Sequence, residues 1–262
     1  MTTALADSKL NRISLEIEDA VARVILRNPP LNVIDVEMMD ELAQALAHIE
    51  SEPRVTVVVV SGEGKAFSAG VDIAAHTPDH VHQMLEKFHG LVRWWLATRK
   101  ITIAAVHGLC LGGGAELAMV CDLVYTSEDA EWGFPEIKLA CFPPVACTAL
   151  ASLVGQKKAA ELILTGRSVT GREAGEIGLA TRAVPDNLLD SAVQACAAQL
   201  LRLSPAALQV AKKASYAWDS MHFDKGLARA EKVYFEDLIK TDDAQEGIRA
   251  FLEKRPPKWS GR

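Results

Sequence analysis

The chain has 262 residues, of which 49% are hydrophobic and 24% charged, and it carries a formal net charge of -6. This composition is typical of a globular protein with a sizeable core, and the length allows one large domain or one domain with an appended piece. The excess of acidic residues argues against nucleic acid as the main partner, although an anionic ligand needs only a local cradle of donors.

The cysteines and the first residues of the chain bear on its compartment. The five cysteines form no CxxC pair and lie mostly in apolar surroundings, so we expect reduced thiols and a cytoplasmic protein. Residues 1–12 (MTTALADSKLNR) contain an acid and lack an apolar core, which predicts no signal peptide. No uninterrupted apolar run is long enough to cross a bilayer, so we expect no membrane partner.

Apolar runs predict the strands of a mostly parallel sheet. Ile13–Glu18 and Ala20–Leu26 predict two short strands, and the second is mostly apolar and therefore buried. Arg54–Ser61 (RVTVVVVS) is rich in β-branched residues, which favours a central strand of a parallel sheet. Ile101–Val106 and Leu123–Thr126 predict two further strands.

Between these strands, apolar residues recur with the period of a helix instead of that of a strand. After Asp35, a plausible N-cap, apolar residues recur on one helical face as far as Ile49. His76–Thr98 predicts a second helix of mixed polarity. Glu131–Leu150 is rich in Phe, Pro and Trp and predicts a loop that carries one carboxylate, Glu136, directly after a proline.

Helices dominate the last part of the chain, where the composition shifts near Leu188. We predict an α/β body over residues 1–187 and a helical region over residues 188–262 that has little core of its own. Its apolar faces are expected to pack on the body or on another subunit. The predicted helices are Asn187–Leu203, a helix from Ser204-Pro205 to about Trp218, Phe223–Lys240 and Asp243–Lys254.

The stretch Leu109–Asp122 (LCLGGGAELAMVCD) carries a pattern that indicates a functional site. A strand that runs through a glycine turn into a helix leaves backbone N–H groups unpaired, where the helix dipole favours negative charge. Glu116, three residues after Gly113, rises over the same face as those amides. The stretch combines an anion cradle with a candidate acid or base. On its own it also fits a close-packed turn with a solvated glutamate.

Further motifs join this stretch in a fixed order. They are KAFSAGVD (65–72), LGGGAEL (111–117), FPEIKL (134–139) and LTGRSVTGREAGEIGL (164–179). Together the motifs resemble the crotonase (enoyl-CoA hydratase/isomerase) superfamily over nearly the full length. The resemblance implies the ClpP/crotonase type of α/β fold, with a ββα spiral core over residues 1–187 and a C-terminal helical trimerisation region over residues 188–262.

The resemblance also implies an active site. The backbone amides of Val71 and Gly113 match the oxyanion hole, which holds the thioester C=O and the enolate-like charge that forms on it. Glu116 and Glu136 match the two glutamates that hold and activate a water in hydratases. Paired carboxylates suit this reaction because one accepts a proton from water while the other supplies a proton to carbon. The presence of both favours a hydratase.

The implied ligand is an acyl-CoA substrate, with coenzyme A as part of the thioester and with no separate cofactor and no metal. The family clamps adenine against the backbone that matches Ala69–Ile73. A C-terminal lysine, matched by Lys254, reaches the phosphates, often from a neighbouring subunit. The resemblance implies a homotrimer or a homohexamer.

Several pocket positions depart from the common hydratase pattern. Phe134 stands where Gln is usual, and residues 140–147, including Phe142 and Pro144, replace a glycine-rich run. This aromatic, proline-stiffened wall looks like the cyclohexa-1,5-dienecarbonyl-CoA hydratase branch, whose product is 6-hydroxycyclohex-1-ene-1-carbonyl-CoA in anaerobic benzoyl-CoA degradation. Two alternatives stay open: a generic short-chain enoyl-CoA hydratase, and a non-catalytic homologue that binds acyl-CoA or RNA.

Histidines and cysteines complete the list of candidate groups. His76, His80, His82 and His89 lie close in sequence but lack metal-site spacing, so we expect a solvated helix face and no metal. Cys141 and Cys147 have no obvious His partner and are predicted to line a pocket.

Overall fold

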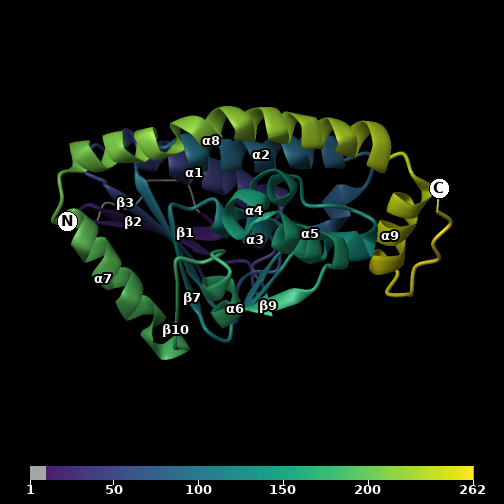
Figure 1. Ribbon diagram of the computed structural model, residues 1–262, viewed down its shortest axis with the longest axis horizontal. Helices are drawn as coiled ribbons and strands as arrows, with labels where there is room; N and C mark the ends of the chain where they lie inside the picture. Colours follow the sequence, from purple (N-terminus) through teal and green to yellow (C-terminus); the bar gives the residue numbers. More distant parts are fainter. Residues whose placement is uncertain (1–9, 262) are drawn as a thin grey trace.

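The computed structural model describes residues 10–261, the side chains of residues 217–221 excepted. Residues 1–9, part of the stretch in which no signal peptide is predicted, lie outside the described residues. Within the described range there are two sheets, one of six strands in the order β1-β2-β3-β5-β7-β10 and one of four strands in the order β4-β6-β8-β9 (Figure 1). The strands are β1 Ile13–Glu18, β2 Val21–Leu26, β3 Val57–Gly62, β4 Ala66–Ser68, β5 Ile101–Val106, β6 Leu109–Leu111, β7 Leu123–Ser127, β8 Glu131–Gly133, β9 Ser168–Thr170 and β10 Arg182–Val184.

The larger sheet confirms the strands predicted from the apolar runs. β1 pairs with β2 in antiparallel fashion, and the strands from β2 to β10 in the sheet order are parallel. In β3, Val58 and Val60 belong to one apolar cluster, whereas Val57 and Val59 belong to another. Successive side chains of a strand point to opposite faces, so this sheet is buried on both sides, as a continuous apolar run predicts.

Helices cover the two faces of this sheet. On one face lie α1 (Val36–Ser51) and α2 (Val81–Ala97), and on the other lies α7 (Leu189–Leu201), at the lower left of Figure 1. The other helices are α3 Gly113–Met119, α4 Pro144–Val154, α5 Gln156–Thr165, α6 Gly171–Glu176, α8 Pro205–Val233 and α9 Asp242–Leu252. Short helical turns occupy η1 Ile73–His76, η2 Pro135–Leu139, η3 Asp186–Leu188 and η4 Tyr234–Leu238, the last of them π-helical.

The first helix of the predicted C-terminal region packs on the body. Leu189, Val193 and Ala197 lie on one stripe of α7 and are buried against the second apolar cluster of the sheet. α8 runs across the top of the molecule in Figure 1, and α9 lies at its far end. Part of the predicted helical region therefore packs on the α/β body of the same chain.

A repeating order of elements builds the core. Each turn contributes one strand to the large sheet, one short strand to the small sheet and then a helix, as in β3-β4-α2, β5-β6-α3 and β7-β8-α4. The short strands β4, β6 and β8 are parallel neighbours. Their carboxyl ends therefore lie along one edge, and each short strand is followed there by a different loop.

Helix starts follow the local signals, but one predicted helix end is wrong. The Asp35 carboxylate accepts a hydrogen bond from Met38 N at 2.8 Å, which confirms the N-cap. Ser204 caps α8 through Ala207 N at 3.3 Å. α8 was predicted to end near Trp218, yet it continues to Val233. The reason is that residues 218–223 contain neither glycine nor proline to end a helix.

Prolines account for two further corrections. His76–Thr98 is not one helix, because Pro78 separates η1 from α2, which begins only at Val81. Glu131–Leu150 is not a loop, because it folds into β8, η2 and α4. Pro135 and Pro144 each occupy the first turn of a helical segment, a position where the missing N–H costs nothing.

Candidate active site

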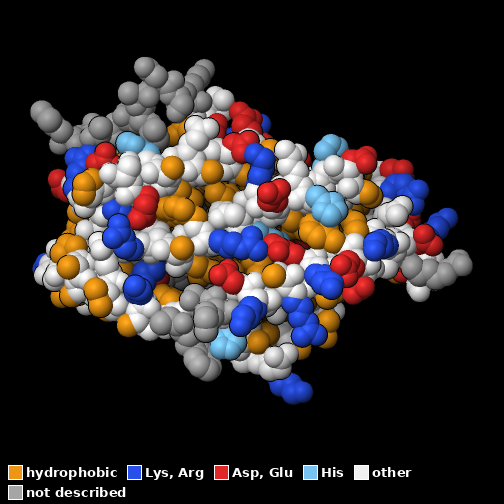
Figure 2. All heavy atoms as spheres, turned by 90° about the horizontal axis from the view of Figure 1, so that it is seen from above, with side chains coloured by type: hydrophobic (Ala, Val, Ile, Leu, Met, Phe, Trp, Pro, Cys, Tyr) orange, Lys and Arg blue, Asp and Glu red, His pale blue; other side chains and the backbone are white. Residues whose placement is uncertain are grey.

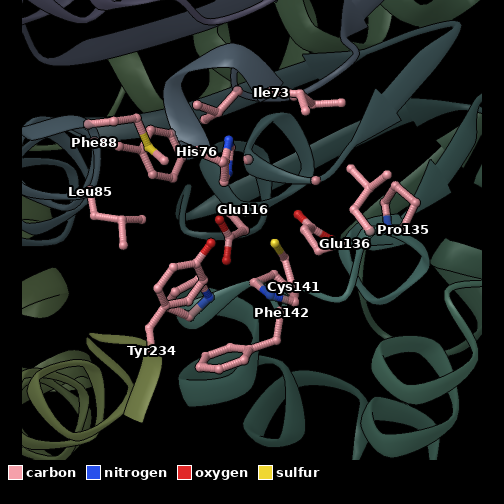
Figure 3. Close-up of a pocket in the computed structure, with 18 of the residues that line it drawn as sticks. Ile73, His76, Leu85, Phe88, Glu116, Pro135, Glu136, Cys141, Phe142 and Tyr234 are labelled. Atoms are coloured by element: carbon pink, nitrogen blue, oxygen red, sulfur yellow. The ribbon is translucent and has the colours of Figure 1, made fainter. Parts of the chain in front are cut away.

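The candidate site lies at the common edge of β4, β6 and β8. Val71 follows the end of β4 by three residues, Gly113 follows the end of β6 by two, and Glu136 follows the end of β8 by three. Strand register places Ser68 opposite Cys110 and Leu111 opposite Gly133, so the three loops start side by side. They enclose a cavity of about 90 Å³ that Val71, Gly113, Glu116 and Glu136 all line (Figure 3).

Two backbone amides face this cavity without acceptors. Ile34 pairs with the segment after β4 by donating to Gly70 O at 2.9 Å and accepting from Asp72 N at 3.1 Å. Ile34 thus pairs with the residues on either side of Val71, and the Val71 N–H points away from Ile34. Gly113 is the first residue of α3, where an N–H has no partner within the helix. Neither amide has an acceptor among the described residues.

Close backbone packing requires glycine at this turn. A Cβ on Gly113 would lie 2.6 Å from Val71 Cγ2 and 3.5 Å from Val71 N, which shows how near the two amides are. Gly112 has a φ of 51°, and a Cβ there would lie 2.7 Å from Oε1 of Glu136. The amides and one carboxylate therefore meet at one glycine turn, and they can bind an oxyanion beside a proton donor.

Glu116 is held in the first turn of α3. Its side chain is buried, with the residue 3% exposed, and Oε1 accepts a hydrogen bond from Ala146 N at 2.9 Å. Burial raises the pKa of Glu116 to about 7, against the lowering effect of the hydrogen bonds from the Ala146 and Val145 amides. Those amides at the start of α4 give this carboxylate a fixed orientation.

Glu136 lies in η2 on the other side of the cavity. Its Oε2 is buried and has no hydrogen-bond partner among the described residues. Burial, and then the charge of Glu116, raise the pKa of Glu136 to about 8. The pair therefore has one carboxylate stabilised by backbone donors and one with a buried oxygen that has no hydrogen-bond partner among the described residues. Near neutral pH this arrangement can share one proton between the two groups.

Two residues at this cavity were not anticipated as site residues. Tyr234, 1% exposed, reaches it from the π-helical turn after α8. His76 lines it from η1, with Nδ1 3.0 Å from Asp72 O. Only the folding of the helical region over the cavity brings Tyr234 there, and its sequence surroundings carry no signal for this.

The predicted pocket wall is partly corrected. Phe142 and Pro144 line the cavity, together with Cys141. Phe134 is not among the lining residues, and its side chain is fully buried in the core. Side chains two residues apart in an extended segment share a face, and Phe134 follows the core residue Trp132 by two. Cys147 lines a larger apolar groove of about 740 Å³ instead, and Phe142 lines both spaces.

The residues predicted to hold coenzyme A lie in two separate places. Ala69 and Ile73 line the cavity, next to the segment that presents the Val71 amide. Lys254 is exposed beyond the end of α9, with a φ of 54°. Ile248 of α9 does line the cavity, so the helix that leads to Lys254 packs against the site.

The histidines do not form a solvated helix face. His80 and His82 are exposed, but His76 is half-buried at the cavity and His89 is fully buried, with Nδ1 2.7 Å from Glu231 Oε1. The prediction is therefore wrong for His76 and His89. In the part of the chain that the structure describes, no three His, Cys, Asp or Glu side chains are grouped to hold a metal. No helix in the same range has the length and apolar content to span a membrane.

Two sheets wound as ββα turns, with unpaired amides and a carboxylate pair at one strand edge, define the crotonase fold of acyl-CoA enzymes. The chain belongs to the enoyl-CoA hydratase/isomerase family, whose sequence model it matches over residues 16–262. The crystal structure of an enoyl-CoA hydratase from Mycobacterium avium subsp. paratuberculosis superposes with a TM-score of 0.87 at 27% identity, covering 96% of this chain and 100% of that one.

Curated relatives are similar along almost their whole length. The cyclohexa-1,5-dienecarbonyl-CoA hydratase of Thauera aromatica is 36% identical over 251 residues, which cover 96% of this chain and 97% of the relative. A probable enoyl-CoA hydratase of Rhizobium meliloti is 38% identical over 252 residues, with 95% and 97% coverage. The predicted family and enzyme class are thereby confirmed.

Proposed function

We propose that this enzyme adds water to cyclohexa-1,5-diene-1-carbonyl-CoA and forms 6-hydroxycyclohex-1-ene-1-carbonyl-CoA, in the degradation of aromatic compounds. The observation that carries the proposal is the placement of Glu116 and Glu136 on one small cavity beside the unpaired amides of Val71 and Gly113. A hydratase needs these groups: two donors for the thioester oxygen, a base for water and an acid for carbon.

The two glutamates take different roles because their surroundings differ. Backbone donors at Ala146 and Val145 favour the ionised form of Glu116, so this carboxylate accepts a proton from the water. The charge of Glu116 favours the protonated form of Glu136, so Glu136 supplies a proton to carbon. Both raised pKa values lie close to neutral pH, where each transfer is efficient.

The electron balance on the ring follows from conjugation. The water oxygen bonds to the β-carbon as its proton passes to Glu116, and the electron pair moves into the thioester carbonyl held by the amides of Val71 and Gly113. The second double bond extends this enolate to the γ-carbon, which takes the proton of Glu136. The remaining double bond is then conjugated with the thioester again, which gives the 6-hydroxy product.

The cavity supports a flat ring as the acyl group. Its wall includes the rings of Phe88 and Phe142 and the prolines Pro135, Pro143 and Pro144, and its volume is about 90 Å³. A rigid six-membered ring loses no rotamer freedom in such a slot, whereas a flexible chain does. The similarity to the Thauera aromatica hydratase supports the same substrate.

A straight-chain enoyl-CoA hydratase is the second candidate. Relatives from Bacillus subtilis and Rhizobium meliloti bear enoyl-CoA hydratase names, and the chain is 35% and 38% identical to them. The same four groups would act on crotonyl-CoA, with the proton delivered to the α-carbon. A homologue that binds acyl-CoA or RNA without turnover would have no use for two buried glutamates with raised pKa values.

We further propose that coenzyme A lies along Ala69 and Ile73 and that Lys254 contacts its phosphates. Exposed apolar side chains on the helical region, among them Val210 and Phe251, support assembly into a homotrimer or a homohexamer. Figure 2 shows hydrophobic side chains between charged ones on the face of the molecule seen from above. The free cysteines in the described residues suit the reducing cytoplasm.

The test compares kcat/KM for cyclohexa-1,5-diene-1-carbonyl-CoA and crotonyl-CoA on one preparation. We expect a preference for the ring of roughly ten- to a hundred-fold, because an apolar wall discriminates by shape alone. Phe142→Ala, which opens the cavity toward the larger groove, should shift the ratio toward the straight chain.

Phe134→Leu is the matched control, because this ring lies in the core and should leave the ratio unchanged. Equal values for the two substrates, or a preference for crotonyl-CoA, would leave the straight-chain hydratase as the function. In deuterium oxide the ring product should carry deuterium at its γ-carbon.

A further inference from the structure

Tyr234 brings a further polar side chain to the cavity from a helical segment far along the chain. Its hydroxyl oxygen is buried, has no oxygen or nitrogen partner within residues 10–261, and lies beside the weakly bonding thiol of Cys141. Figure 3 shows the ring rising from below with the hydroxyl next to Glu116. A buried hydroxyl without a partner is costly, so its persistence at a cavity indicates a partner that is present only with substrate or water.

The backbone around Tyr234 is arranged to hold this hydroxyl in place. Tyr234 begins a π-helical turn, in which Ile239 N donates to Tyr234 O at 2.9 Å. Such turns re-aim side chains and are frequent at functional sites. One turn earlier, Glu231 lies 2.7 Å from Nδ1 of buried His89 and 2.9 Å from Arg93 Nη2, which fastens α8 to α2.

Ring packing fixes the side chain itself. The ring of Tyr234 meets the ring of Phe142 edge to face, with centroids 5.2 Å apart. Burial, and then the neighbouring Cys141, Glu136 and Glu116, raise the pKa of the Tyr234 hydroxyl far above its usual range. The phenol therefore stays protonated and is available as a hydrogen-bond donor.

We propose that the Tyr234 hydroxyl donates a hydrogen bond to the oxygen of the water that adds to the substrate, and therefore to the new hydroxyl group of the product. A buried water typically makes about three hydrogen bonds. Glu116 and Glu136 supply two, and the Tyr234 hydroxyl, which lies next to Glu116 in Figure 3, can supply the third. This role rests on the proposed hydration and adds a residue that places the nucleophile.

The kinetic test uses Tyr234→Phe, which removes the hydroxyl and keeps the ring. We expect kcat for hydration to fall about ten-fold or more with KM nearly unchanged. The thermal midpoint should change little, because the lost hydroxyl has no oxygen or nitrogen partner in the described structure and the neighbouring Cys141 thiol is a weak one. Tyr125→Phe is the matched control: Tyr125 lies on β7 against the α7 face of the sheet, and its variant should keep wild-type kcat.

The binding test asks whether the hydroxyl touches the product oxygen. In a Glu136→Gln background, where turnover is stalled, calorimetry gives Kd for 3-hydroxybutyryl-CoA and for butyryl-CoA, which differ by one hydroxyl. Adding Tyr234→Phe should raise Kd for the hydroxyacyl ligand about ten-fold and leave Kd for butyryl-CoA unchanged.

The possible outcomes distinguish a wrong role for Tyr234 from a wrong assignment of the reaction. Equal loss of affinity for both ligands would assign Tyr234 to pocket support, and no loss for either would place its hydrogen bond elsewhere. Each result overturns the proposal. A wild-type enzyme that hydrates neither the cyclic dienoyl-CoA nor crotonyl-CoA would instead remove the hydration itself, before any variant is compared.

Discussion

One half of the cavity presents backbone amides, and the other half presents side chains. The backbone half consists of the amides of Val71 and Gly113, set by a glycine turn in which backbones touch. The side-chain half consists of Glu116, Glu136 and Tyr234, which come from α3, η2 and η4 and are oriented by packing and a few hydrogen bonds. The backbone half has no group that titrates, whereas the side-chain half depends on protonation.

This difference decides how each half responds to substitution. In the backbone half the shape of the turn matters, and the chemistry of the side chain at Val71 does not. In the side-chain half we expect a change of one atom to alter the proposed reaction without moving the chain. The amides are donors fixed before substrate arrives, and such preorganised donors need no rearrangement during the reaction.

Removing a carboxylate should give the largest effect. Glu116→Gln and Glu136→Gln should each lower kcat by about 10²–10⁴-fold while acyl-CoA still binds, because each loses a proton acceptor or donor of similar shape. The double variant should be little worse than the worse single variant, since the pair acts on one water. Stopped-flow rates and calorimetric affinities measure both quantities, and near-wild-type turnover by either single variant would exclude that residue.

If the same pair carries out the proposed reaction, it should set the pH dependence of the wild-type enzyme. kcat/KM should rise as pH passes about 7, where Glu116 loses its proton and becomes the base. It should fall above about 8, where Glu136 loses the proton it supplies. The two apparent pKa values belong to the pair as a whole. A profile that is flat from pH 6 to 9 would contradict the division of roles.

Adding one methyl group at Gly113 should disrupt the geometry of the backbone half. In Gly113→Ala the new Cβ would lie 2.6 Å from Val71 Cγ2, so the Val71 side chain or the turn must shift, and we expect the two amides to move apart. Loss of one such donor costs about 10²–10³-fold in kcat. Val71→Ala alone should be nearly silent, because it removes side-chain atoms and keeps the amide.

The double variant makes this comparison specific. With Val71→Ala present, the nearest atoms to the Cβ of Gly113→Ala are Phe88 Cζ at 3.2 Å and Val71 N at 3.5 Å. Removing Cγ2 should therefore restore part of the lost kcat. A double variant as slow as Gly113→Ala alone would show that the amides are not displaced by this contact.

The backbone half was predictable from local sequence only at Gly113, whereas the Val71 amide was expected from the resemblance to the crotonase superfamily. Strand, glycine turn and helix follow one another locally, and Asp35 capped its helix as expected. The side-chain half was predictable only where motif order carried it, at Glu116 and Glu136. Tyr234 was missed because a π-helical turn and a long-range packing contact place it, and neither leaves a local pattern.

The wall of the cavity shows the same limit. Phe134 was predicted to shape the pocket, but the two-residue period of the strand turns it into the core with Trp132. His89 was predicted to be solvated, but α8 covers it through Glu231, more than a hundred residues later. Local polarity did not predict either outcome: the Phe134 side chain follows the period of the strand, and the surroundings of His89 depend on a distant segment that packs above it.

A charge outside both halves should give the smallest effect. Lys254 is exposed beyond α9 and lines no part of the cavity, so it can contribute binding but no chemistry. Lys254→Ala should raise KM for acyl-CoA several-fold, roughly 1 kcal/mol, and leave kcat unchanged, as expected for a contact that is equal in the bound and transition states. Added salt should reduce the difference between variant and wild type, because exposed charges are screened. Lys213→Ala, an exposed lysine on α8, is the control and should leave KM unchanged. A fall in kcat with constant KM would place Lys254 in the reaction itself, and an unchanged KM would mean that coenzyme A is held by the backbone of residues 69–73 without it.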